Sequence, residues 1–157
     1  MKTFKMVLSV LFGALLLAAC TKEYSSESYL GPKGSWEFMN GTSKYSGSLN
    51  EIHQNSGLGT QSVSVKGKSD NGSRIFQLSV STSELKPGTY LISLGQCAFS
   101  YTDNSGKTIY QANKDAGEFT ITILTIGTEK ITGTFSGTVI DESSNAVEIA
   151  RGKFTVE

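Results

Sequence analysis

From residue 34 to the end of the chain, hydrophobic and polar side chains alternate, and almost no stretch holds the period of a helix. The clearest run is GEFTITILTI, in which Phe119, Ile121 and Ile123 alternate with polar threonines. Successive side chains of a strand point to opposite faces of a sheet, so this alternation gives each strand one apolar face. We therefore expect an all-β domain over residues 34–157, with about ten short antiparallel strands.

Turn residues divide these alternating runs. Asn40-Gly41 separates the first two runs and predicts a tight hairpin, because both residues tolerate a positive φ. Residues 51–60 are polar and contain glycine, so we expect a connection there. The segment STSELK is compatible with one helical turn that ends before Pro87, because proline biases the residue before it away from the helical region.

The last third of the chain has the most regular pattern. GEFTITILTI, EKITGTFSGTVID and NAVEIARGKFTV predict three long consecutive antiparallel strands. Gly133 and Gly137 interrupt the second of these runs, which marks places where an aromatic ring or a backbone comes close. In the third run the apolar positions change parity near Arg151-Gly152, which predicts a bulge with one extra residue.

Ten strands in about 125 residues cannot form one open sheet without awkward edges. We therefore expect an antiparallel β-sandwich or a partly open barrel. The chain is 38% hydrophobic, which is sufficient for one core. The candidates for the centre of this core are all aromatic: Trp36, Phe38, Phe76, Tyr90, Phe99, Phe119, Phe135 and Phe154.

The first twenty residues follow a different pattern. Lys2 and Lys5 precede an apolar run over residues 7–19, which is broken by one serine and followed by Cys20. At about 13 residues this run is too short to span a bilayer, which takes about 20 residues. The basic start, the length of the run and the small residues at its end are those of a cleaved signal peptide. We therefore expect residues 1–19 to be removed.

The sequence LAAC at the end of this leader resembles the lipobox of bacterial lipoproteins. In that family the thiol at the position of Cys20 accepts a diacylglyceryl group, and the amino group exposed by cleavage is then acylated. The resemblance implies a protein anchored to the membrane through acyl chains on Cys20, and two such chains already anchor a protein stably. Thr21, where other lipoproteins carry aspartate, is similar to what directs many Gram-negative lipoproteins to the outer membrane. An ordinary secretory signal with a chance cysteine is the alternative.

Residues 20–33 are rich in serine and charge, contain Gly31 and Pro32, and show no hydrophobic period. This composition predicts a flexible tether between the lipid and the domain. Loss of the leader removes two lysines and leaves 12 basic against 14 acidic residues, a net charge of about −2. The balance excludes the basic surface of a nucleic-acid-binding protein.

Few residues can carry chemistry. If Cys20 is acylated, Cys97 has no partner for an intramolecular disulfide. Cys97 alternates with Phe99 and Tyr101, which favours a small buried hydrophobic residue over a reactive thiol. His53 is the only histidine and lies in the expected polar connection, where exposure to solvent is the ordinary case. These counts exclude a zinc site built from histidine and cysteine clusters.

The acidic residues likewise fall in expected turns. The candidate carboxylate pairs for glycoside cleavage are Asp115 with Glu118 and Asp141 with Glu142, but solvated loop charges explain both pairs better. The turns DNGS and DNSG each offer one carboxylate, Asp70 and Asp103, whereas calcium takes about six to eight oxygen ligands. Asx turns explain these two residues. We therefore expect no catalytic residues, no metal and no cofactor.

Several runs resemble those of small β-sandwich lipoproteins of Bacteroidetes, in families catalogued as domains of unknown function. These runs are WEFMNGTSKYSG, LKPGTYLI, GEFTITIL, ITGTFSGTV and RGKFTV. The resemblance covers most of residues 34–157 and implies the β-sandwich fold. It implies no catalytic residues.

The expected function is that of a lipid-anchored cell-envelope protein, on either face of the outer membrane, that binds a glycan or a protein partner or acts as an accessory module. A structural envelope component without a small-molecule ligand is the alternative, and a hydrolase ranks behind both. Tyr45, Tyr101 and Tyr110 can stack on sugars or peptides where they lie outside the core, which the pattern leaves open. Coplanar exposed aromatics would indicate a glycan, an open sheet edge a protein partner, and a pocket of titratable groups an enzyme.

Overall fold

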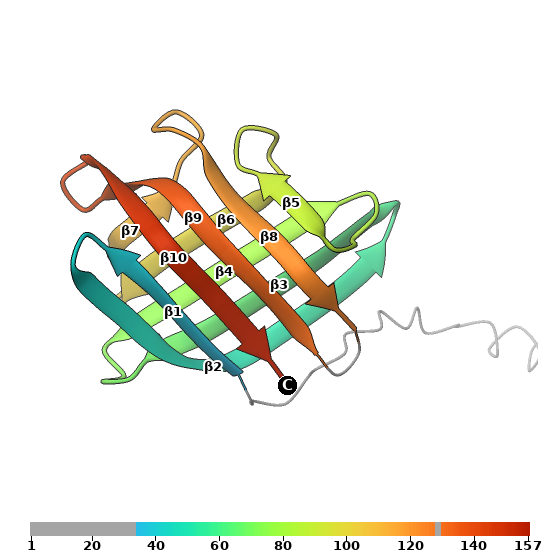
Figure 1. Cartoon of the computed structure of the whole chain (residues 1–157), viewed down its shortest axis with the longest axis horizontal. Helices are drawn as coiled ribbons and strands as arrows, with labels where there is room; N and C mark the ends of the chain where they lie inside the picture. The colour runs from blue at the N-terminus through green and yellow to red at the C-terminus, as the bar shows by residue number, and fades with distance from the viewer. Residues whose placement is uncertain (1–33, 128–129) are drawn as a thin grey trace, which may run out of the picture.

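The computed structural model describes residues 34–127 and 130–157, and these residues form ten antiparallel strands and no helix (Figure 1). The all-β class and the expected number of strands are confirmed. The strands are β1 (Gly34–Asn40), β2 (Ser43–Gly57), β3 (Thr60–Ser69), β4 (Arg74–Thr82), β5 (Gly88–Leu91), β6 (Cys97–Asp103), β7 (Thr108–Ala112), β8 (Phe119–Ile126), β9 (Ile131–Asp141) and β10 (Ala146–Val156). The expected leader (residues 1–19), Cys20 and the expected tether (residues 20–33) lie outside the described residues. In the described part, no helix is long and apolar enough to cross a membrane.

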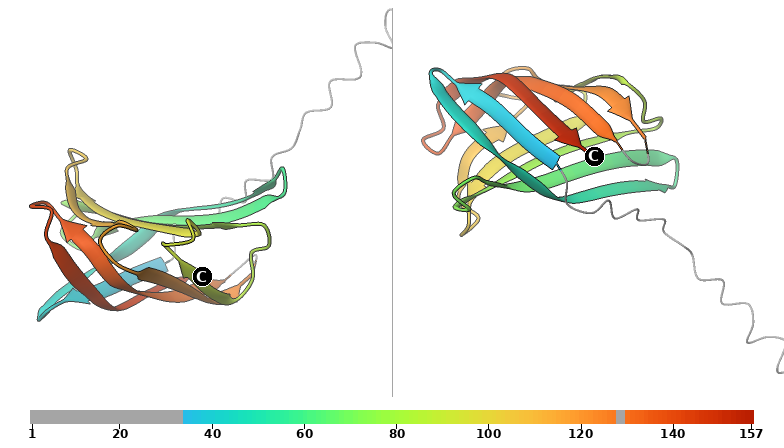
Figure 2. Two further views of the ribbon diagram at one scale, coloured as in Figure 1. Left: turned by 90° about the horizontal axis from the view of Figure 1, so that it is seen from above. Right: turned by 60° about the horizontal axis from the view of Figure 1, so that its bottom comes forward.

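The strands form two crossed layers that join into a partly open barrel. Neighbouring strands pair in the order β10-β1-β2-β3-β4-β6-β7-β9-β8-β5, and β10 also pairs with β9. Eight strands therefore close a ring, while β8 and β5 extend from β9 as an arm. Figure 1 shows β1, β10, β9, β8 and β5 crossing in front of the other five strands, and Figure 2 shows the two layers from other directions.

The ring closes because β9 changes its partner along one edge. Over Ile131–Gly137 this edge pairs with β8, and over Val139–Asp141 it pairs with β7. Only three residue pairs join β7 to β9, so the arm of β8 and β5 separates from β7 over the rest of the length. The fold thus combines the two architectures expected from the sequence.

All eight aromatic residues expected at the centre of the core are buried, with at most 6% of any of them exposed. Phe38 lies among six other rings whose centroids are 4.9–6.3 Å from its own. The described residues bury no polar or charged residue in this core. A cavity between the layers measures about 10 Å³, which is the room of a single water molecule. It is lined by Val63, Val65, Leu78, Ser79, Val80, Ile121, Ile123 and Phe154. This cavity is therefore too small for a ligand larger than water.

The first hairpin is present one residue later than expected. Asn40 pairs with Ser43, so the two turn residues are Gly41 and Thr42. Gly41 has a φ of 57°, and glycine at the first central position is typical of a type II′ turn. The shift by one residue follows from glycine, which adopts this backbone conformation more readily than asparagine does.

Two of the expected connections are wrong. Residues 51–57, expected in a polar connection, continue β2, and the turn contains only Leu58 and Gly59. No helical turn forms before Pro87, where the chain bends between β4 and β5. The hydroxyl of Tyr90 donates to the carbonyl of Lys86 (2.5 Å) and accepts from its N–H (3.1 Å), which fixes the bend without a helix.

The expected bulge in the last strand is confirmed. Ile149 of β10 pairs with Gly137 and Gly152 pairs with Phe135, so two residues of β10 lie opposite one residue of β9. Arg151, one of these two, has a φ of 53°. The extra residue keeps both halves of β10 facing the core.

Candidate functional site

Cys97 behaves as the small buried hydrophobic residue expected from the sequence. It is 6% exposed, and its Sγ lies 3.4 Å from the carbonyl oxygen of Tyr90. Burial raises the pKa of the Cys97 thiol to about 11, and nearby Glu118 adds to this effect. The group is a neutral thiol at physiological pH, which is the unreactive form.

His53 lies on β2 rather than in a connection, but its side chain is exposed, as expected. Its Nε2 atom is 4.0 Å from a carboxylate oxygen of Glu51, which is also 3.4 Å from the ammonium group of Lys66. Within residues 34–127 and 130–157, no group of three or more His, Cys, Asp or Glu residues could hold a metal ion. His53 belongs to an exposed charge cluster on the sheet.

Two aspartates of the expected turns hold the backbone of those turns. Asp103 accepts hydrogen bonds from the N–H groups of Ser105 (2.8 Å) and Lys107 (2.9 Å). Asp141 accepts from the N–H groups of Ser143 and Asn145 in the same way. These hydrogen bonds, led by the Ser105 hydroxyl at Asp103 and the Asn145 N–H at Asp141, lower the pKa of both carboxyls. Both are therefore Asx-type turn residues.

Three of the remaining acidic candidates are engaged with neighbours. Asp70 accepts from the hydroxyl of Ser46 (2.5 Å), and the Asx turn expected at this residue is formed instead by Asn71, whose Oδ1 accepts from the N–H of Ser73 (3.0 Å). Glu118 accepts from the hydroxyl of Ser93 (2.6 Å), and Glu142 pairs with Lys107 (2.7 Å). One carboxylate of each candidate pair is therefore held by a neighbour outside that pair.

The three tyrosines left open by the sequence belong to the core and its margin. Tyr101 is 3% exposed, whereas Tyr45 and Tyr110 are half-buried and their hydroxyl groups lie 3.2 Å apart. Burial raises the pKa of Tyr110 to about 12, and the hydrogen bond to Tyr45 acts in the same direction. In the described part of the chain, the large exposed hydrophobic residues are all leucines: Leu58, Leu94 and Leu124. This surface therefore has no flat aromatic platform for a sugar.

A polar groove crosses the outer face of β1, with a volume of about 380 Å³. Its polar lining comprises Ser35, Glu37, Ser46, Asp70, Lys153 and Thr155. Glu37 is 2.9 Å from both Lys44 and Lys153, and their hydrogen bonds, that of Lys153 first, lower the pKa of its carboxyl. These ion pairs are exposed, so they neutralise the charge of Glu37 without adding much stability.

The longest open feature is the edge of β2. β1 covers that edge only over Ser43–Ser48, whereas β3 pairs with the other edge as far as Gly57. Residues 51–57 therefore have a strand neighbour on one side only among the described strands. The side-chain amide of Gln54 donates to the carbonyl of Gly127 at 3.3 Å. Such an edge presents unpaired N–H and C=O groups, to which an extended peptide can add.

This edge ends at the Leu58 hairpin, by which we mean residues 54–63. Gly57 pairs with Thr60, and the two turn residues Leu58 and Gly59 have φ values of 51° and 77°. Two positive values are those of a type I′ turn, which favours asparagine or glycine at its first position. A leucine in this conformation costs about 1 kcal/mol and here is fully exposed as well. A role for Leu58 was not predicted from the sequence, although a lone leucine between two glycines in a polar run is a visible signal.

The comparisons with known proteins give one match. A family model described as a domain of unknown function, DUF6252, matches residues 52–156. The matched region begins within β2 and ends at the last residue of β10, so it includes the Leu58 hairpin and excludes β1. No curated protein and no solved structure matches the chain.

Proposed function

Since the chain belongs to the DUF6252 family, whose description gives no function, we propose from its own residues that it is a lipid-anchored protein of the cell envelope. Cys20 carries the acyl chains after residues 1–19 are removed, and the domain lies on the outer membrane. The kinship with small β-sandwich lipoproteins of Bacteroidetes is part of the same proposal. Its support is the LAAC box, the apolar run before it and the all-β domain behind it.

The domain itself is a non-enzymatic binding or accessory module for a protein partner. The observation that carries this assignment is the open edge of β2 over residues 51–57. The cavity between the two layers has room for about one water molecule, and Asp103, Asp141 and Glu142 are engaged in turns or an ion pair. An extended segment of a partner would gain backbone hydrogen bonds along this edge.

A glycan is the second candidate for the bound partner. It is favoured by the groove over β1, where Ser35, Ser46 and Thr155 offer hydroxyl groups. Aromatic stacking, which supplies much of the apolar contact with a sugar, is not offered by the described surface. The alternative is a structural envelope component. It would have the same lipid anchor but would bind no ligand at the edge of β2 or in the groove over β1.

Replacing Cys20 by serine is expected to move the protein from the detergent phase to the aqueous phase. Each buried methylene of an acyl chain contributes about 0.8 kcal/mol, so the loss of two or three chains removes the membrane affinity. The measurement is detergent-phase partitioning of the parent and of Cys20→Ser, with mass spectrometry of the mature amino terminus. Equal partitioning of the two proteins, or an unmodified thiol in the parent, would contradict the anchor.

A photo-crosslinking amino acid at His53 is expected to give a discrete protein adduct in intact cells. His53 is exposed and lies on the open edge of β2. Gln77 is also exposed, but it lies on β4 with a paired strand on each side, opposite Lys66 of β3 and Ser100 of β6. The same crosslinker at Gln77 is therefore the matched control. Adducts of equal yield at both positions, or no adduct at His53, would contradict pairing of a protein partner at the edge. Polysaccharide adducts at His53 would instead support a glycan as the bound partner.

A further inference from the structure

The Leu58 hairpin lies at the end of the barrel where the described chain begins. Ser35, at the start of β1, pairs with Ser48, and β2 then continues past this point to Gly57. β10 ends at the same place, because Gly34 pairs with Val156. Figure 1 shows the β2–β3 hairpin extending beyond the start of β1. An anchor attached to residues before Gly34 would therefore hold this end of the domain toward the lipid.

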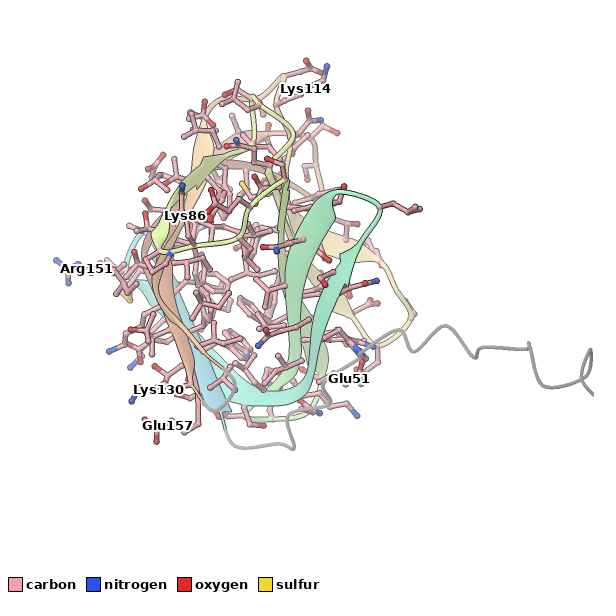
Figure 3. All side chains as sticks on the ribbon, turned by 90° about the vertical axis from the view of Figure 1, so that its right-hand side faces the viewer. Glu51, Lys86, Lys114, Lys130, Arg151 and Glu157 are labelled. Carbon is pink, nitrogen blue, oxygen red and sulfur yellow. The ribbon has the colours of Figure 1, made fainter. Side chains whose placement is uncertain are left out.

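The Leu58 hairpin carries no charge, and two described lysines near it are paired with carboxylates. Residues 54–63 contain no charged side chain. Across from the hairpin, Lys86 pairs with Glu84 at 2.9 Å and Lys130 with Glu157 at 2.7 Å. Figure 3 looks onto this side of the molecule and labels Lys86, Lys130 and Glu157 opposite the hairpin. The tip can thus enter an interfacial environment without removing an unpaired charge from water, which is the expensive step.

We propose that the Leu58 tip inserts its side chain into the interfacial region of a phospholipid bilayer and so orients the tethered domain. This inference rests on the proposed acylation of Cys20. The fourteen peptide units from Cys20 to Gly34 span at most about 50 Å. A flexible chain of that length averages about 20 Å from end to end. At that reach the local concentration of the domain at the surface is in the millimolar range, so a weak contact suffices.

Insertion into a bilayer would explain why a leucine occupies position 58. The turn conformation favours asparagine or glycine, so a leucine is unfavourable for the fold and is exposed to water as well. A bilayer interface is an environment in which an exposed aliphatic side chain is favourable. Because residues 54–63 carry no charge, zwitterionic lipid is sufficient and anionic lipid adds little.

The test uses the acylated full chain in phosphatidylcholine vesicles that contain brominated or spin-labelled lipid. Trp36 is the only tryptophan and is 2% exposed, so it contributes a constant background. Leu58→Trp places a reporter at the tip, and Thr42→Trp places one in the exposed turn at the other end of β1. We expect the tip reporter to be quenched at least about twofold more strongly than the Thr42 reporter.

Equal quenching of the two reporters in an acylated protein overturns this inference and leaves the anchor intact. A sample that mass spectrometry shows to be unacylated overturns the proposed function and this inference together. Amide hydrogen exchange of the unsubstituted protein is the second measurement. Residues 54–63 should exchange more slowly on vesicles than in soluble Cys20→Ser, and equal rates overturn the insertion. Protection that depends on protein concentration, without quenching by lipid, assigns the tip to a protein contact and also overturns it.

Discussion

Replacing Phe38 by alanine is expected to lower the free energy of unfolding by about 3–5 kcal/mol. Phe38 is 0% exposed, and the centroids of six rings lie within 6.3 Å of its own, from Tyr45 at 4.9 Å to Tyr110 at 6.3 Å. These rings come from both layers, so their packing cannot relax into the vacated space by moving one strand. The loss combines the removal of a buried aromatic side chain with a residual cavity.

Thermal or denaturant unfolding of the domain measures this loss. For a domain of this size each kcal/mol shifts the midpoint by about 3–5 °C, so Phe38→Ala should unfold at least about 10 °C below the parent. Leu124→Ala is the control, because Leu124 is 57% exposed. A surface change of this kind is expected to alter stability by less than about 0.5 kcal/mol. Similar midpoints for the two variants would show that the aromatic cluster does not hold the layers together.

The central aromatic residues were predictable because each occupies an apolar position of an alternating run, and such positions face the core. Trp36 and Phe38 share the inward face of β1, and Phe119 heads the inward face of β8. The bulge near Arg151 was predictable for a related reason, since a change of parity in a strand with one buried face requires an extra residue. These are local properties of the sequence, and the structure confirms them.

The extension of β2 was not predictable by the same rule. Residues 51–57 contain only one buried side chain, that of Ile52, because this part of the strand runs past the barrel and has little core to face. Polarity there reflects exposure on both faces rather than the absence of a strand. The expected helical turn does not form because the side chain of Tyr90, four residues further along the chain, bonds to the backbone of Lys86 and fixes a bend instead.

Strand order was beyond the sequence as well. β1 pairs with β10 although they are the first and last strands in the sequence, and β5 pairs with β8 rather than with β4 or β6, its neighbours in the sequence. Alternation indicates which face of a strand is buried but not which strand lies beside it. The open edge of β2 follows from this order, since β1 is too short to cover it. The candidate site therefore became visible only once the pairing was known.

Replacing Gly133 by alanine is expected to destabilise the domain by about 1–3 kcal/mol or more, the range for inserting a methyl group into a packed core. A Cβ atom at this position would lie 2.6 Å from two ring carbons of Phe154 and 2.6 Å from the carbonyl oxygen of Thr122. Phe154 is 3% exposed, and Thr122 pairs with Thr134 in the β8–β9 ladder. Neither neighbour can therefore move without disturbing the core or the sheet.

Gly57→Ala is the matched control, because Gly57 also lies in a strand but a Cβ atom there would meet nothing within 4 Å. We expect this variant to be neutral or to gain up to about 1 kcal/mol from the reduced entropy of the unfolded chain. Equal losses for the two variants would indicate a general cost of alanine in these strands rather than a close approach at Gly133.

The cause of the loss at Gly133 can be divided between the ring and the backbone. If the Phe154 ring is the main obstacle, Phe154→Leu should cost less in the Gly133→Ala background than in the parent, because the smaller side chain makes room for the new methyl group. A double-mutant cycle of unfolding free energies measures this difference, and residues in direct contact typically couple by about 0.5–3 kcal/mol. Additive losses would instead place the obstacle at the Thr122 carbonyl, where the β8–β9 ladder leaves no side chain to adjust. Either result tests the close approach of strands that the glycine pattern predicts.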